Sequence, residues 1–223
     1  MKLIEIFNAL TNGELSQISI GGIENGEISE KNYYAVLSHI NLGLTALYKR
    51  FPLQRSKAVV PLVPGTVDYT LALPDLLKVE AIYTDAGFEL PLNDESEKYS
   101  VFTPAASRLS LHPDFVAQGQ DLNDSYKTTG LNIVYRANHP IINADANGFD
   151  PYIYEVQLPY SHLEPLLYYV ASRVNNPIGM VNEFHAGSSY AAKYEQACQQ
   201  LEVSNLRVDQ FSQPDRISRG GWV

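Results

Sequence analysis

The 223-residue sequence contains a single cysteine, a single tryptophan and two methionines. Cys198 has no second cysteine with which to form an internal disulfide, which fits a protein assembled in the reducing cytosol. The five histidines lie far apart in the chain, without the spacing of metal ligands. We therefore expect no disulfide framework, no metal site and no cofactor.

Long apolar runs and basic residues are also scarce. No run approaches the roughly 18 apolar residues that span a bilayer. The N-terminal MKLIEIFNAL is interrupted by Glu5 and Asn8, with no small-residue cleavage site behind it. We expect neither a membrane protein nor a secreted one. The 16 basic residues against 25 acidic residues give a net charge of −9, which argues against a protein that neutralises DNA phosphates but permits one past which DNA slides.

Catalytic signatures are missing as well. The sequence contains no Gly-rich phosphate loop, no G-x-S-x-G elbow and no H-E-x-x-H pair. Cys198 lies on the apolar stripe of a predicted helix, so we expect it to be buried and not to act as a nucleophile. His162 lies in a predicted first helical turn and is expected to be exposed. The acidic loop at 94–97 is interpreted as solvated rather than as a cation site. These features predict a protein that is not an enzyme.

Helical periodicity dominates both ends of the chain. Apolar residues recur at spacings of three and four between Ser29 and Pro52, which predicts a long amphipathic helix. A shorter helix is predicted from Leu3 to Leu10. A helix also begins at the capping-box pattern Ser161–Glu164, where Tyr160 is placed as a hydrophobic staple. The last predicted helix extends from about residue 183 to 201.

Short β-like runs separated by Pro, Gly, Asn and Asp occupy the middle of the chain. They are KAVVPLV, DYTLAL, KVEAIYT, RLSLH, LNIVYRA and YIYEVQL. Asp85-Ala-Gly87 has the form of a hairpin connection between AIYT and ELPL. These runs predict a small antiparallel β unit.

The order of these elements predicts an α+β fold. Residues 1–54 and 159–205 are expected to form one helical bundle from both ends of the chain, because neither helical half could bury its apolar face alone. The β-rich region 55–158 is inserted between the halves, and residues 206–223 form an extended C-terminal arm.

The predicted arm carries the only tryptophan, Trp222, behind Gly220 and Gly221. A segment such as SQPDRISRGGWV cannot bury enough apolar surface to offset an ordering entropy of roughly 1–2 kcal/mol per residue. Trp222 is therefore expected to be an interface anchor whose neighbouring glycines allow close approach of the backbone. The alternative is that Trp222 folds back on its own bundle.

The chain contains, in this order, the stretches YTLALPDLLKVEAIYTDAGFELPLND, LSLHPDF, LNIVYRANHP, VQLPYSHLEPLLYYVASRV and the terminal RGGWV. Together these stretches resemble the head-to-tail adaptor proteins of tailed bacteriophages, especially the tail tubular proteins of short-tailed phages. The resemblance covers most of the chain from Glu27 onward and rests on hydrophobic and turn residues, not on a catalytic signature.

The resemblance implies a non-enzymatic virion protein, assembled in the host cytoplasm, that acts in DNA ejection. Such proteins usually form a ring of twelve copies that joins the portal protein to the tail nozzle or tail tube. DNA passes through the ring without specific binding, and an extended arm docks on the portal. The residues expected to contact the portal or a neighbouring subunit are Phe211, Ile217, Arg219, Gly220, Gly221, Trp222 and Val223.

A ring of acidic subunits predicts an acidic channel, because a basic lining would bind the phosphates of DNA and hold it in place. The residues expected to line the channel are Glu27, Glu30, Glu183 and Glu195. Two other classes stay open at this point. They are another phage tail-completion or assembly protein, for which ring stoichiometry is the discriminator, and an enzyme with an unrecognised site. A sugar-binding module built on the β unit is a weaker third.

Overall fold

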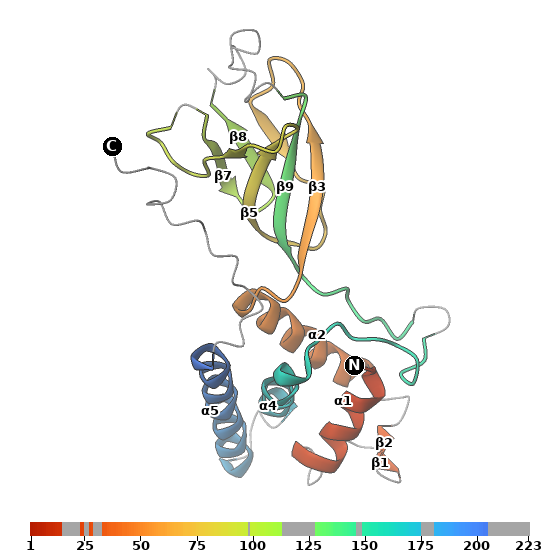
Figure 1. Cartoon of the computed structure of the whole chain (residues 1–223). Coiled ribbons are helices and arrows are strands. Elements are labelled where there is room, and N and C mark those ends of the chain that lie inside the picture. The colour runs from red at the N-terminus through yellow and green to blue at the C-terminus, as the bar shows by residue number, and fades with distance from the viewer. Residues whose placement is uncertain are drawn as a thin grey trace. The chain divides into compact units, whose positions relative to one another are not determined.

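The computed structural model describes residues 1–14, 23–24, 27–28, 33–97, 99–112, 128–145, 149–174 and 181–204. Two units divide these residues between them (Figure 1). Unit 1 comprises residues 1–53 together with the described residues from 141 onward, and unit 2 comprises residues 54–140. Unit 2 is therefore an insertion in the sequence of unit 1.

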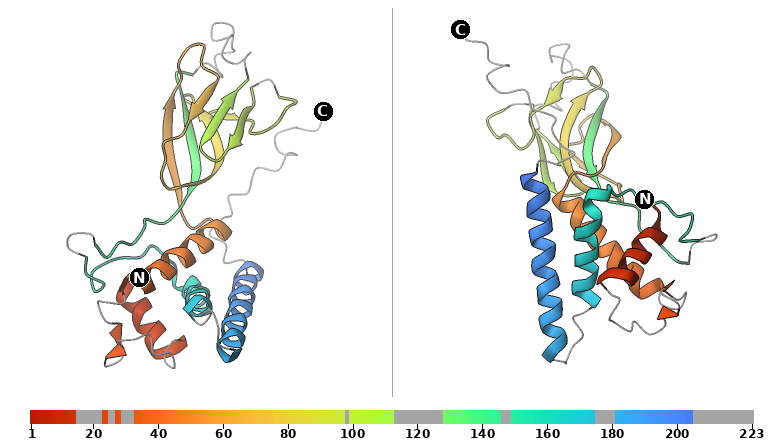
Figure 2. Two further views of the ribbon diagram at one scale, coloured as in Figure 1. Left: turned by 180° about the vertical axis from the view of Figure 1, so that it is seen from behind. Right: turned by 60° about the horizontal axis from the view of Figure 1, so that its bottom comes forward.

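Unit 1 is mainly helical (Figure 2). Its elements are α1 (Leu3–Ala9), a π-helical turn η1 (Leu10–Glu14), the short strands β1 (Ile23–Glu24) and β2 (Glu27–Ile28), α2 (Tyr33–Arg50), a 3-10 turn η3 (Tyr160–His162), α4 (Leu163–Val174) and α5 (Val181–Val203). The helices predicted from the apolar periodicity near the N-terminus, before Pro52, after Ser161 and before residue 201 are confirmed as α1, α2, α4 and α5.

The core of unit 1 combines residues from distant parts of the chain. Leu44 of α2, Leu166 of α4 and Cys198 of α5 are all completely buried in one cluster. Helix α4 packs against both α2 and α5. Gly43 allows close packing where α2 meets α4, because a β-carbon there would lie 2.7 Å from Cδ1 of Leu166 and the Leu166 side chain would have to shift.

The segment between unit 2 and α4 is irregular and belongs to unit 1. Asn41 of α2 anchors it, donating from Nδ2 to the carbonyl of Ile142 at 2.9 Å and accepting the Ile142 amide at 3.0 Å. The run YIYEVQL was predicted as a strand, and that prediction is wrong: within the part of the chain that the structure describes, its ladder contact is limited to an isolated bridge between Glu155 and Lys2. Residues 141–158 were expected in the β-rich region but cluster with the helices.

The start of α4 also differs from the prediction. The turn η3 follows Pro159, with no side-chain cap, and the Ser161 hydroxyl lies 3.0 Å from Nδ1 of His162 instead. Tyr160 is 68% exposed and is not a staple; its hydroxyl donates to Glu5 at 3.0 Å. His162 is buried, with its ring edge-on to Phe51 at 4.8 Å, because η3 turns it toward the core.

Burial makes His162 a source of pH-dependent stability. Desolvation lowers the pKa of His162, and desolvation with the nearby Arg173 charge lowers that of His39. Below about pH 6.5 the unfolded chain therefore binds more protons than the folded chain, so the free energy of unfolding falls as the pH falls. We expect His162→Phe to flatten the slope of stability between pH 7 and 5, measured by denaturant titration. His112→Asn, in unit 2, is the control; an unchanged slope for His162→Phe would contradict this assignment.

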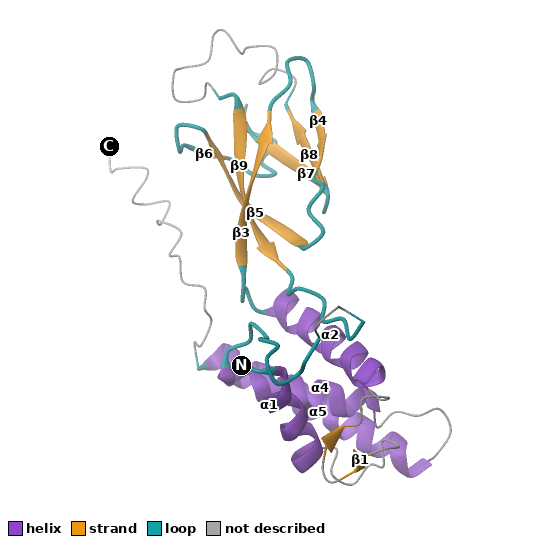
Figure 3. Cartoon of the chain, turned by 90° about the vertical axis from the view of Figure 1, so that its right-hand side faces the viewer, coloured by secondary structure: helices purple, strands orange, loops and turns teal. Residues whose placement is uncertain are grey.

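Unit 2 contains two antiparallel sheets (Figure 3). Its strands are β3 (Arg55–Pro61), β4 (Asp68–Thr70), β5 (Leu76–Thr84), β6 (Glu89–Leu90), β7 (Val101–Ala105), β8 (Arg108–Leu111) and β9 (Gly130–Ala137). Their order is β3-β9-β5-β6 in the larger sheet and β4-β8-β7 in the smaller one. Alternate side chains of both sheets form a second apolar core that includes Ile82, Leu109 and Ile133.

The predicted α+β class with antiparallel strands is confirmed, and five of the six predicted β runs contain strands. The predicted hairpin at Asp85–Gly87 is present, with β5 paired to β6 and Gly87 at φ +85°. The Asp85 carboxylate accepts the backbone amides of Thr129 at 2.8 Å and Gly130 at 3.1 Å, which connects this hairpin to the start of β9.

An Arg–Glu–Arg cluster crosses three neighbouring strands of the larger sheet. Arg55 of β3 and Arg136 of β9 are direct partners in the antiparallel register. Glu80 of β5 accepts from Arg55 Nε at 2.6 Å and from Arg136 Nη2 at 2.9 Å. Like charges opposite each other destabilise a strand pair, so the carboxylate is what makes this register favourable.

Glu80→Gln is expected to lower the free energy of unfolding of unit 2 by about 1–3 kcal/mol, since two partly buried guanidinium groups lose their shared anion. Denaturant unfolding measures this loss. Glu95→Gln, in an exposed loop of the same unit, is the matched control and should change stability very little. An equal effect of the two substitutions would argue that the Glu80 cluster does not stabilise the sheet.

Candidate functional site

Most residues predicted to contact partners or the channel lie outside the described residues. This holds for Glu30 and for the seven arm residues Phe211, Ile217, Arg219, Gly220, Gly221, Trp222 and Val223. The backbones of Glu27 and Glu183 lie in β2 and α5, but their side chains are not among those described. The arm and three of the four channel positions therefore remain predictions.

Glu195 is the one predicted channel residue whose side chain is described. It lies on α5 with 56% of its side chain exposed, and it pairs with Arg50 at 2.7 Å. Arg50, in the last turn of α2, also binds Glu202 through Nε at 2.9 Å. Hydrogen bonding to Glu202 and then to Glu195 raises the pKa of Arg50, which stays charged. The acidic charge of Glu195 is thus partly compensated within its own unit.

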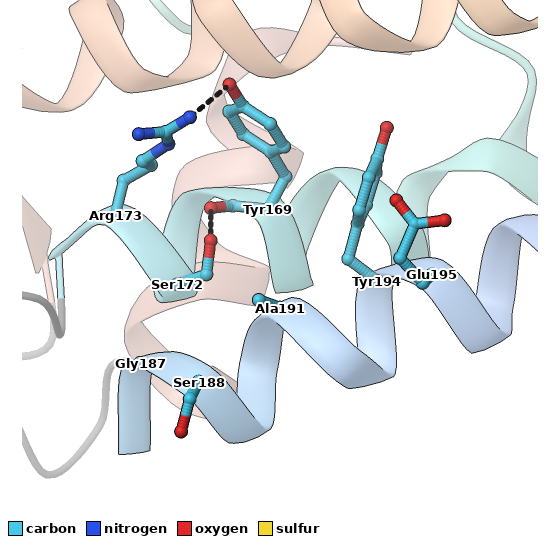
Figure 4. A pocket seen from close by; sticks show the side chains of 8 residues that line it. All are labelled: Tyr169, Ser172, Arg173, Gly187, Ser188, Ala191, Tyr194 and Glu195. Carbon is cyan, nitrogen blue, oxygen red and sulfur yellow. Dashed lines mark hydrogen bonds between the residues drawn. The ribbon is translucent and has the colours of Figure 1, made fainter. Parts of the chain in front are cut away.

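A surface groove lies beside Glu195, between α4 and α5 (Figure 4). Its volume is about 370 Å³. Helix α4 contributes Tyr169, Ser172 and Arg173, and helix α5 contributes Gly187, Ser188, Ala191, Tyr194 and Glu195.

The two tyrosines of the groove are held in fixed positions. The rings of Tyr169 and Tyr194 meet edge-on, with centroids 5.3 Å apart. The guanidinium of Arg173 lies 5.3 Å from the centre of the Tyr169 ring and donates to the Tyr169 hydroxyl at 3.4 Å. This arrangement presents aromatic faces with a cation at one end of the groove and a carboxylate at the other.

Small residues on α5 open the space in the groove. Gly187, Ser188 and Ala191 occupy about one turn of α5, where larger side chains would fill the gap to α4. Such a groove suits an aromatic or aliphatic side chain with a cation beside it. The groove is not predictable from the sequence, because small residues carry no apolar periodicity and their alignment with α4 is a tertiary contact.

The groups behind the groove are unsuited to covalent chemistry. Cys198 is completely buried, as predicted, and burial is the largest cause of the raised pKa of its thiol. The pKa of Tyr194 is raised as well, by burial and then by Cys198. Both groups therefore stay protonated at neutral pH, and thiolate, not thiol, is the nucleophilic form of cysteine.

In the part of the chain that the structure describes, no three His, Cys, Asp or Glu residues gather as metal ligands would. In the acidic loop, Asp94 accepts hydrogen bonds from the amide and hydroxyl of Ser96. The described helices include none whose length and apolar character would let it cross a membrane.

A family model described as SU10 adaptor protein matches residues 22–218, which include unit 2, unit 1 without its first 21 residues, and most of the predicted arm. None of the curated proteins matches the chain.

Proposed function

We propose that this chain, which belongs to the SU10 adaptor protein family of bacteriophage adaptors, forms a ring that joins the portal protein to the tail. The observation that carries the proposal is the family match over residues 22–218. An adaptor interacts with other head and tail proteins, and the ring of twelve copies, the portal contact and the tail nozzle or tail tube contact are our proposals. The protein would be a structural component of the virion without enzymatic activity.

The arrangement of the chain supports this role. The helices of unit 1 are proposed to act as one bundle assembled from both ends of the chain, with unit 2 as the inserted β region. Residues 206–223 are proposed as an extended arm that docks on the portal or on a neighbouring subunit. Trp222 is its anchor, because buried tryptophans dominate the energetics of many interfaces.

The charge of the chain suits a DNA conduit. Each copy contributes a formal charge of −9, and an acidic wall does not retain DNA by counterion release. Glu27, Glu30 and Glu183 remain the proposed channel residues. Glu195 would contribute less repulsion than the others, because Arg50 compensates part of its charge.

Electron microscopy of the purified chain mixed with the portal protein of the same phage tests the proposal. We expect a ring of twelve copies on one end of the portal, with a channel wall that is not dominated by Lys and Arg. A particle of different stoichiometry, placed elsewhere in the tail, would favour a tail-completion protein. The absence of any complex with portal or tail proteins would overturn the adaptor role.

Trp222→Ala is expected to weaken assembly on the portal by about 2 kcal/mol or more, roughly thirtyfold in affinity. The melting temperature of the isolated chain should stay nearly unchanged, because an interface anchor does not belong to the subunit core. Deletion of residues 220–223 should act in the same way. A loss of subunit stability of roughly 3–5 kcal/mol would instead show that Trp222 packs on its own bundle.

A further inference from the structure

We propose that the groove between α4 and α5 receives the arm of a neighbouring copy of this chain. Trp222 would occupy the space above the small residues of α5, and Arg219 would pair with Glu195. The inference rests on the proposed function, because it requires copies of the chain to associate. It adds the receiving site, which the family match does not specify.

The end of the groove near Gly187 and Ser188, where Trp222 is proposed to bind, offers favourable contacts for an indole ring. Gly187, Ser188 and Ala191 leave room beside Tyr169, whose ring offers an edge or face for aromatic contact. Arg173 is exposed next to that ring, and a guanidinium packs favourably over an indole face. An apolar wall and a cation are therefore available within one site.

The opposite end of the groove carries the negative charge of Glu195, which is complementary to the positive charge of Arg219. Glu195 is half-exposed, and its Oε2 atom accepts from Arg50. A carboxylate has about four lone-pair sites and can accept from a second cation. Arg219 is the basic residue nearest to Trp222 in the sequence, three positions before it.

The spacing of the arm matches the spacing of the groove. Ser188 and Glu195 are seven positions apart on α5, which corresponds to about 10 Å along the helix axis. Arg219 and Trp222, three positions apart, also span about 10 Å when extended. An arm that returns along α5 from its C-terminal end would meet Glu195 first and Ser188 second, in the order of Arg219 and Trp222.

The length of the arm allows it to reach a neighbouring copy. Glu195 lies about 12 Å back along α5 from Val203, whereas the residues between Val203 and Arg219 can span about 50 Å when extended. A contact between the arm of one copy and the groove of the next is heterologous, and heterologous contacts close into rings when the rotation between copies closes. The same contact is therefore compatible with ring formation.

Trp222 is the sole tryptophan, so its fluorescence reports directly on this contact. The full chain is measured over a concentration series, with sedimentation velocity run in parallel. We expect the emission of Trp222 to shift to the blue as the chain associates. A blue shift at every dilution without association would place Trp222 in its own groove. Such a concentration-independent shift would overturn the proposal. Association without a blue shift, or a failure of the chain to associate, would overturn it as well.

A pair of variants tests the groove itself. Ala191→Leu fills the groove and is expected to weaken association at least about tenfold. Ala192→Leu, at the adjacent exposed position outside the lining, is the matched control. Equal effects of the two variants would contradict the assignment.

Mixing two variants that each associate poorly tests whether the arm binds the groove of a neighbouring copy or the groove of its own copy. Ala191→Leu keeps the arm but loses the groove, and Trp222→Ala keeps the groove but loses the anchor. Adding the tryptophan-free variant to Ala191→Leu should shift the emission of the remaining Trp222 to the blue. If no shift occurs while both variants still bind the portal, this inference fails and the adaptor role stands.

Discussion

Replacing Phe51 with alanine is expected to lower the free energy of unfolding of unit 1 by about 3–5 kcal/mol. Phe51 is only 2% exposed and follows the last residue of α2, where its amide donates to the Leu47 carbonyl at 2.7 Å. Its ring packs against His162 and belongs to the cluster that joins α1, α2 and α4. Truncation would leave a cavity at the point where all these elements meet.

Hydrogen exchange combined with denaturant unfolding measures this loss, and Tyr34→Ala on the exposed face of α2 is the control. A second readout follows from the contact with His162. Water that enters the cavity would reduce the desolvation that lowers the pKa of His162, so this pKa should rise in the Phe51→Ala variant. A loss below about 1 kcal/mol would show that the core collapses around the deletion.

Replacing Leu109 with alanine is expected to cost unit 2 about 2–5 kcal/mol. Leu109 lies on β8, is completely buried and contributes to the second apolar core, which shares no residue with the core of unit 1. We therefore expect faster exchange in β3, β5, β8 and β9, with α2 and α4 keeping their protection.

Peptide-resolved hydrogen exchange separates the two units in a single experiment. Val59→Ala, on the exposed side of β3, is the control in the same unit. Phe51→Ala should give the reciprocal pattern, with unit 1 affected and unit 2 protected. An equal loss of protection in both units for either variant would show that the chain unfolds as one cooperative body.

The sequence predicts best those elements whose own residues define them. Helix α2 has buried residues at positions 36, 37, 40, 44, 47 and 48, which repeat the helical period, and Pro52 follows shortly after its end. The same argument located α1, α4 and α5. Strands β5 and β9 are also evident, because they are long and rich in β-branched or aromatic residues.

Other segments depend on contacts that local sequence does not encode. YIYEVQL alternates like a strand, yet Tyr152 and Ile153 are exposed, and among the described residues it pairs only through the bridge from Glu155 to Lys2. Strand β7 was missed because Pro104 lies within it; a strand with a β-bulge in its pairing tolerates that proline. His162 was expected to be exposed because a helical pattern cannot reveal the 3-10 turn that precedes α4.

The candidate site also combines residues that the sequence predicts with contacts that it does not predict. The sequence alone predicts Trp222 as an interface anchor, because a lone tryptophan in a polar segment has few apolar neighbours with which to pack. The groove cannot be found in this way, because Ala191 and Ser188 are unremarkable until α4 lies beside them. Likewise, the acidic residue Glu195 was recognised, but its pairing with Arg50 joins positions 145 residues apart.

The insertion of unit 2 has a mechanical consequence. Both connections to unit 1 leave the same end of the β3–β9 pair, where Arg55 faces Arg136. Tension that separates these connections would peel the two strands apart one hydrogen-bonded pair at a time, instead of shearing the whole ladder at once. The hydrogen bond from the Ala137 amide to the Gln54 carbonyl, at 3.0 Å, would break first, and the contacts of Glu80 with both arginines would follow.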